Sequence, residues 1–201
     1  MPRPASSSSG LIGPNAVLQT IPVLDGLLGR ERRDDVLSRV ELSAVPDGTQ
    51  MIPETLAAGL HRHIRLIAPA QAARVSTLAG TATANYILAY RIPKPAQILL
   101  RCLPATLSAK CLSHAITRHA WTFVGSGQFA ALDPWTFDIH NNPLIRAETS
   151  SACLCHWHAA VFARLYQALV STECSCREIM CGAQPPGGVC RFEIRVAGSA
   201  G

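Results

Sequence analysis

The sequence has few charged and few aromatic residues for its length. Of 201 residues, 15% are charged, 5% are aromatic and 48% are hydrophobic, so the chain can bury a sizeable core. Pro, Gly, Arg or Asp interrupts every apolar stretch well before the roughly 18 residues that a transmembrane helix requires. The Pro/Ser-rich start lacks the apolar segment of a signal peptide. We therefore expect a cytoplasmic protein that does not span a membrane.

Motifs for the common redox cofactors are also missing. The segment 125–127, Gly-Ser-Gly, lacks the third glycine and the strand–turn–helix context of a dinucleotide-binding loop. It also lacks the flanking positions of a hydrolase nucleophile elbow. We therefore expect no NAD or flavin site, and the sequence identifies no hydride donor.

The net charge of +5 originates in the middle of the chain. Between residues 68 and 146, seven Lys and Arg residues face only Asp133 and Asp138. These basic residues are spread out and few aromatic residues lie between them, which is not typical of a nucleic-acid-binding surface. We expect no nucleic-acid partner. An ordinary solvated surface and a pocket rim that attracts a carboxylate are the two open interpretations.

Hydrophobic periodicity predicts helices first and strands last. Helical patterns occur at 11–29, 31–42, 53–67, 70–91, 96–119 and 153–170. Strands are expected at 121–129, once within the loop 130–150, and at 172–180 and 189–196, where a Pro/Gly-rich turn predicts a hairpin. We expect an α+β fold in which N-terminal helices pack with an antiparallel sheet that ends in this hairpin. One domain covers 11–197, behind a disordered tail at 1–10.

The helix expected at 70–91 has a face of small residues. Its members are Ala72, Ala79, Gly80, Ala82 and Ala84. Small residues permit the close approach of another helix or of a flat ligand, and both interpretations stay open.

Six of the eight cysteines lie in the last quarter of the chain. Without a secretory signal, such a cluster indicates metal binding rather than disulfides. Cys176 and Cys190 can face each other across the predicted hairpin, near Cys155, and Glu173 joins them if a bulge redirects its side chain. Three thiolates and one carboxylate suit a tetrahedral, structural Zn²⁺.

Other interpretations of the cysteines stay open. The thiols can instead be free and buried, or bind an iron–sulfur cluster. Cys153, Cys174 or Cys181 can replace a proposed ligand. Cys102 and Cys111 lie in an apolar helical pattern and are expected to be small core residues.

Seven stretches of the sequence resemble the bacteriochlorophyll-biosynthesis family of 4-vinyl reductase proteins. They are 10–15 (GLIGPN), 51–54 (MIPE), 84–93 (ANYILAYRIP), 118–123 (RHAWTF), 125–127 (GSG), 155–160 (CHWHAA) and 190–194 (CRFEI). The C-terminal half, about 120–197, is similar to the vinyl-4-reductase domain. This module is also the ligand-sensing part of aromatic-responsive transcription activators, and it is related in fold to a vesicle-tethering subunit.

The resemblance implies an α+β domain that encloses a small-molecule pocket and is often a homodimer. In the sensor relatives, a Cys just before a Trp, a Glu-x-x-Cys and a later Cys hold zinc. These positions fall on Cys155, Glu173, Cys176 and Cys190. The chain departs from the pattern because His156 precedes Trp157, and because extra residues before Cys190 make Cys181 a rival ligand.

The family name implies the reduction of a vinyl group on a chlorophyll precursor. Because that reaction needs an electron donor and no site for one is visible, we favour binding of a Mg-tetrapyrrole intermediate and its delivery to bacteriochlorophyll-synthesis enzymes. The expected ligand-binding residues are Tyr86, Tyr90, Arg91, Arg118, Trp121, Phe123 and His158, with an Arg for a propionate and His158 as axial ligand. The alternatives are a vinyl reductase that uses an external donor, a small-molecule sensor and, for His158, a structural role.

Overall fold

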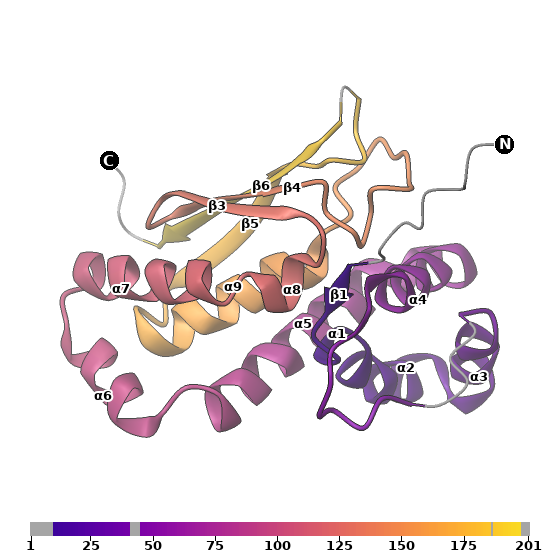
Figure 1. Ribbon diagram of the computed structural model, residues 1–201, viewed down its shortest axis with the longest axis horizontal. Helices are drawn as coiled ribbons and strands as arrows, with labels where there is room; N and C mark the ends of the chain where they lie inside the picture. The colour runs from indigo at the N-terminus through magenta and orange to yellow at the C-terminus, as the bar shows by residue number, and fades with distance from the viewer. Residues whose placement is uncertain (1–9, 41–44, 186, 198–201) are drawn as a thin grey trace, which may run out of the picture.

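The structure is a computed structural model that describes residues 10–40, 45–185 and 187–197. The expected tail at 1–10 lies outside the described residues except for Gly10, as does the end of the helix expected at 31–42. The described chain is an α+β fold with N-terminal helices packed on a four-stranded antiparallel sheet, as expected (Figure 1).

The N-terminal part is a group of short helices closed by a small β-ladder. Strands β1 (Leu11–Ile12) and β2 (Ile52–Pro53) pair antiparallel. The helices are α1 (Asn15–Leu18), α2 (Thr20–Leu28), α3 (Arg30–Ser38) and α4 (Glu54–Ile67). Leu60 and Ile64 of α4 are buried one turn apart, which is the pattern of a helix with one apolar face.

The middle of the chain is helical, and prolines stand at its boundaries. Helix α5 (Pro69–Tyr90) is followed by α6 (Lys94–Cys102), α7 (Ala105–Arg118) and the short α8 (Trp121–Val124). The prediction of a strand over 121–129 is therefore wrong for its first half. Phe123 and Val124 turn toward the core as part of α8, and the strand begins only after Gly125, whose φ is +55°.

The sheet has the strand order β3-β4-β6-β5 with antiparallel pairing throughout. Its strands are β3 (Gln128–Asp133), β4 (Thr136–His140), β5 (Cys174–Met180) and β6 (Val189–Val196). The segment 130–150 thus contributes to two strands where one was expected. Helix α9 (His156–Leu169) connects β4 to β5 and packs against β5.

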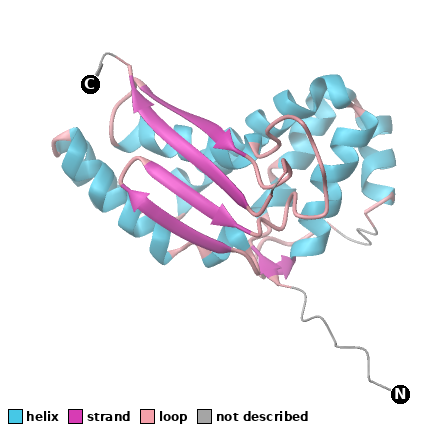
Figure 2. Ribbon diagram, turned by 90° about the horizontal axis from the view of Figure 1, so that it is seen from above, coloured by secondary structure: helices cyan, strands magenta, loops and turns pink. Residues whose placement is uncertain are grey.

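One face of the sheet packs against helices, and the face toward the viewer in Figure 2 carries no helix of the described chain. Phe137 and Phe192 form a cross-strand pair on the inner face and contact Phe162 of α9, with ring centroids 5.1 and 5.4 Å away. On the outer face, Arg191 donates two hydrogen bonds to Asp138. This alternation is what a sheet with one solvated face requires.

Helix α9 covers the small-residue face of α5. A Cβ atom on Gly80 would lie 2.3 Å from the backbone oxygen of Trp157 and 2.9 Å from the Cβ of Ala160. The interpretation as close helix packing therefore applies around Gly80, where no space is left for a flat ligand.

Candidate metal centre

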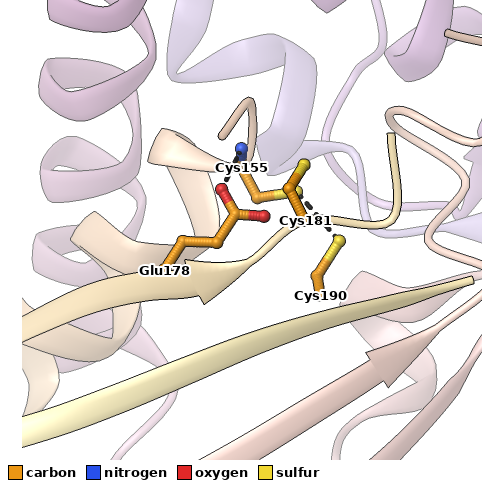
Figure 3. Close-up of side chains that lie close together, drawn as sticks. All are labelled: Cys155, Glu178, Cys181 and Cys190. Atoms are coloured by element: carbon orange, nitrogen blue, oxygen red, sulfur yellow. Dashed lines mark hydrogen bonds between the residues drawn. The ribbon is translucent and has the colours of Figure 1, made fainter. Parts of the chain in front are cut away.

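Four buried side chains converge at the end of β5, the start of α9 and the start of β6. They are Cys155, Glu178, Cys181 and Cys190, and one ligand atom from each lies within 4.8 Å of the others. Figure 3 shows the carboxylate and the three thiols pointing toward one another. Three sulfurs and one carboxylate oxygen form a donor set that suits a tetrahedral Zn²⁺.

A bulge in β5 brings Glu178 and Cys181 to the same side. In a regular strand, residues three positions apart point to opposite faces. The pairing of β5 with β6 shifts register between Glu178 and Met180, so the residues after the shift change faces. Cys181 follows directly after the strand and turns inward beside Glu178.

The backbone of the two neighbouring elements fixes the other ligands. Cys155 is the N-cap residue of α9, and its backbone N–H donates a hydrogen bond of 2.8 Å to Oε2 of Glu178. Cys190 lies in β6 opposite Ile139 of the central strand β4. The four ligands therefore tie α9, β5 and β6 together.

Hydrogen-bond donors around the sulfurs favour thiolates. Asn142 Nδ2 lies 3.2 Å from Cys155 Sγ and 3.7 Å from Cys190 Sγ. The backbone N–H of Gly182 donates to Cys190 Sγ over 3.4 Å. N–H donors directed at a charged sulfur stabilise it and orient it, as outer-shell groups do around metal ligands.

The protonation of the cluster leaves a place for a cation. Burial raises the pKa of Glu178 to about 8 and the pKa of Cys155 well above its usual value. Hydrogen bonds from Cys155 and Cys190 lower the pKa of Cys181. Within the described chain, Oε1 of Glu178 is buried and has no hydrogen-bond partner. A divalent cation would satisfy this oxygen and compensate the thiolates, so the residues fit a zinc ion.

The expected ligand set differs from this cluster at two positions. Cys155 and Cys190 belong to it, whereas Glu173 is exposed before β5 and Cys176 pairs with Ile194, four residues beyond Cys190. Cys176 and Cys190 therefore do not face each other. The sequence contains Glu-x-x-Cys twice, at 173–176 and at 178–181, and only the second copy follows the bulge.

The remaining cysteines lie outside the cluster. Of the three alternative ligands named from the sequence, Cys181 is a member, while Cys153 and Cys174 are not. Cys153 instead donates a weak hydrogen bond to the backbone oxygen of Glu178. The expectation that Cys102 and Cys111 are core residues is wrong, because both are exposed.

The expected ligand-binding residues occupy separate places. Tyr86, Tyr90 and Arg91 form a group at the end of α5, with the two rings 5.0 Å apart and Arg91 over Tyr86. Arg118 and Trp121 are exposed at α7 and α8. These residues therefore do not line one cleft.

Phe123 and His158 lie in the interior, with ring centroids 6.2 Å apart. His158 is 1% exposed, and burial lowers the pKa of its imidazole to about 4. Its Nε2 lies 3.5 Å from the backbone oxygen of Phe123. This environment is that of a neutral histidine within the core.

A hollow of about 550 Å³ lies beside the metal centre, between α5, α9 and β5. Glu178 belongs both to its wall and to the metal cluster. The alanine-lined part consists of Ala159, Ala160 and Ala163 of α9 and Ala152 before it. We call it the alanine hollow. A second hollow of the same volume lies between α7 and β3, and none of the seven expected ligand-binding residues is among the described residues that line either hollow.

Comparison with known structures identifies the fold. The chain is similar to a mutant of the Fe(II) unliganded H-NOX protein from K. algicida, with a TM-score of 0.61, 11% identity, and coverage of 94% of this chain and 98% of that chain. An H-NOX structure from a study of heme distortion gives a TM-score of 0.57 at 10% identity, over 92% of this chain and 95% of the other. At this identity, the likeness concerns the fold alone.

Comparison of sequences identifies the family. Residues 135–196 match the vinyl-4-reductase domain. The chain is 45% identical to the bacteriochlorophyll synthase 23 kDa chain of Cereibacter sphaeroides over 91% of its length and 89% of that protein. It is 46% identical to the protein of the same name from Rhodobacter capsulatus, over 93% and 88%. The chain therefore belongs to the family of the bacteriochlorophyll synthase 23 kDa chain.

Proposed function

We propose that this protein binds a vinyl-bearing Mg-tetrapyrrole intermediate of bacteriochlorophyll synthesis in the alanine hollow and delivers it to the enzymes of that synthesis. The names of the two relatives support the pathway. The H-NOX structures, one of which concerns heme distortion, support a tetrapyrrole as the class of ligand.

The observation that carries the proposal is a stripe of small side chains on α9. His156, Ala159, Ala160 and Ala163 are spaced i, i+3, i+4 and i+7, so they share one helix face, and all four line the hollow. Methyl groups leave the helix surface shallow and apolar, so a flat macrocycle can lie against it. The volume of about 550 Å³ is in the range of small-molecule sites.

Two polar groups at the edge of the hollow suit the polar parts of such a ligand. His156 begins the stripe, and imidazole is a common ligand of metal ions, here the Mg²⁺ of the bound substrate. Arg177, which is exposed, can pair with a carboxylate substituent of the macrocycle. His156 takes the axial role that the sequence alone gave to its neighbour His158.

The metal centre has a structural role in this proposal. Zinc held by Cys155, Glu178, Cys181 and Cys190 would fix the end of β5 against the start of α9, which are two walls of the hollow. Four protein ligands fill a tetrahedral zinc and leave no position for a substrate. Its contribution to binding is therefore the shape of the hollow.

Titration of the purified, metal-loaded protein with a vinyl-bearing chlorophyllide tests the proposal. We expect the absorption bands of the pigment to shift on binding. Phenylalanine at Ala163 should fill the hollow and weaken binding at least about tenfold, because a large side chain takes the place of the macrocycle. Phenylalanine at the exposed Ala115 of α7 serves as the control. Absence of any spectral shift would refute pigment binding, whereas a shift unaffected by Ala163→Phe would place the site elsewhere.

The same sample separates delivery from catalysis. We expect the vinyl absorption band to persist when NADPH or a reduced ferredoxin is added to the complex. Loss of the band with such a donor alone would make the protein an autonomous vinyl reductase.

A further inference from the structure

The region around α6 is free of acidic side chains. From residue 55 to residue 132 the sequence contains eight Lys and Arg residues and no Asp or Glu. Helices α7 and α9, which α6 contacts, contain no acidic residue either. This part of the molecule therefore has a positive potential with no negative charge on its own elements to neutralise it.

Helix α6 has its polar and apolar sides reversed relative to a helix of a globular core. Its one buried residue is Gln97, whose amide donates hydrogen bonds to the backbone oxygens of Leu88 and Ile92. Arg101 also points back to the protein and donates to the backbone oxygen of Ala168 over 2.9 Å. The two large aliphatic residues Ile98 and Leu99 are each 61% exposed.

The outward residues of α6 form one continuous face. Helical spacing places Lys94, Pro95, Ile98, Leu99 and Cys102 on the same side, and all are exposed. We call this set the α6 face. Leu107, in the first turn of α7 after Pro104, adds a further aliphatic side chain that is 50% exposed. In Figure 1, α6 lies at an outer corner of the molecule, away from the sheet.

We propose that the α6 face docks on the surface of an anionic lipid bilayer. Aliphatic side chains flanked by lysine and arginine are the composition of helices that lie in the headgroup region, where the apolar groups enter the acyl boundary and the cations contact acidic lipids. A nucleic acid would require a basic face without exposed aliphatic residues. At nine residues, α6 is about 14 Å long, so it lies on the bilayer and does not cross it. Within the described chain, no helix is long and apolar enough to span a membrane.

This surface is separate from the alanine hollow, and no residue of the α6 face lines that hollow among the described residues. The inference stands whether or not the protein binds a pigment. If it does, docking would keep an apolar ligand close to the lipid phase.

Sedimentation of the full-length, metal-loaded protein with vesicles tests the proposal. We expect binding to vesicles of phosphatidylglycerol mixed with phosphatidylcholine, weaker binding at high salt, and little binding to phosphatidylcholine alone. The double change Ile98→Ser/Leu99→Ser should lower the affinity about tenfold or more, because two aliphatic chains no longer enter the bilayer. Lys94→Glu should lower binding to the anionic vesicles only.

The matched control is Leu66→Ser, since Leu66 is 65% exposed on α4 and lies outside the α6 face. Its vesicle binding should equal that of the unmodified protein. Equal melting temperatures and zinc contents would show that every variant folds. Absence of binding to either vesicle, or binding that Ile98→Ser/Leu99→Ser leaves intact, would overturn the proposal. A dimer that this double change converts to monomers, without vesicle binding, would assign the face to a second copy of the chain instead.

Discussion

The Sγ atoms of Cys155 and Cys190 lie 3.2 Å apart although 35 positions separate the two residues in sequence. One thiol stands at the start of α9 and the other in β6, so their contact joins the last helix to the returning strand of the hairpin. Glu178 and Cys181 complete the group. Each of the four is therefore expected to be needed for a bound metal.

Cys181→Ser or Cys190→Ser should abolish zinc binding. A serine hydroxyl is a poor substitute for a thiolate, and the remaining ligands stay buried with uncompensated charge. Since loss of a structural metal is among the largest effects of single substitutions, we expect the free energy of unfolding to fall by about 4 kcal/mol or more. Elemental analysis of the purified variants and urea denaturation measure the two effects.

Cys176→Ser and Glu173→Gln are the matched controls for the metal centre. They change the first copy of Glu-x-x-Cys and leave the cluster intact. Their zinc content should equal that of the unmodified protein. Loss of zinc from Cys176→Ser together with its retention in Cys181→Ser would show that the first copy holds the metal.

The sequence predicted the chemistry of this centre better than its membership. Cysteine count and spacing indicated three thiolates and a carboxylate, and two of the four residues, Cys155 and Cys190, are in the cluster. The choice between two copies of Glu-x-x-Cys depends on the β-bulge after Glu178. A bulge depends on how two strands pair, which the pattern within one strand does not encode.

The fold class followed from periodicity, because long helices such as α5 and the C-terminal hairpin have strong local patterns. The errors concern segments whose surroundings override the pattern. The aromatic and β-branched residues at 121–124 favour a strand in isolation, yet they form α8. Cys102 follows an apolar pattern that predicts burial, but α6 turns Gln97 inward and its aliphatic residues outward.

Gly80→Ala should destabilise the protein by about 1–3 kcal/mol, because the added methyl group would lie 2.3 Å from the backbone oxygen of Trp157. The helices would have to move apart to accept it. Gly26→Ala in α2 is the control, since a Cβ there meets nothing within 4 Å. That change should stabilise the protein by about 0.4–1 kcal/mol by restricting the unfolded chain. Urea denaturation gives both values, and equal effects of the two changes would contradict the packing of α5 on α9.

Glu54→Gln should destabilise the contact between the N-terminal helices and the start of the sheet. The carboxylate is 6% exposed, accepts hydrogen bonds from the backbone N–H and hydroxyl of Ser126, and pairs with Arg146. An amide loses the charge and turns a donor toward groups that donate, so we expect a loss of about 1–3 kcal/mol. Asp35→Asn, in the exposed pair with Arg39, should change stability by less than about 0.5 kcal/mol. Thermal unfolding of both variants makes the comparison, which fails if their losses are equal.

Acidification should destabilise the protein through His61. This residue is 2% exposed, its Nε2 lies 3.2 Å from the backbone oxygen of Ala16, and burial lowers the pKa of the imidazole to about 3. The unfolded chain, with an ordinary histidine pKa of about 6.5, therefore binds a proton that the folded protein excludes. The stabilisation is fully present above about pH 6.5 and declines by about 1.4 kcal/mol per pH unit as the pH falls toward 3.

Denaturation of His61→Gln tests the contribution of this residue. Glutamine cannot titrate, and its amide can still donate to the oxygen of Ala16, so the loss of stability between about pH 6.5 and about pH 5 should be smaller than in the unmodified protein. Burial of His158 acts in the same direction in both proteins, so the difference between the two slopes isolates His61. His114→Gln replaces an exposed histidine and should leave the slope unchanged. Identical slopes for His61→Gln and the unmodified protein would mean that His61 is protonated in the folded state, which the apolar surroundings of its ring oppose.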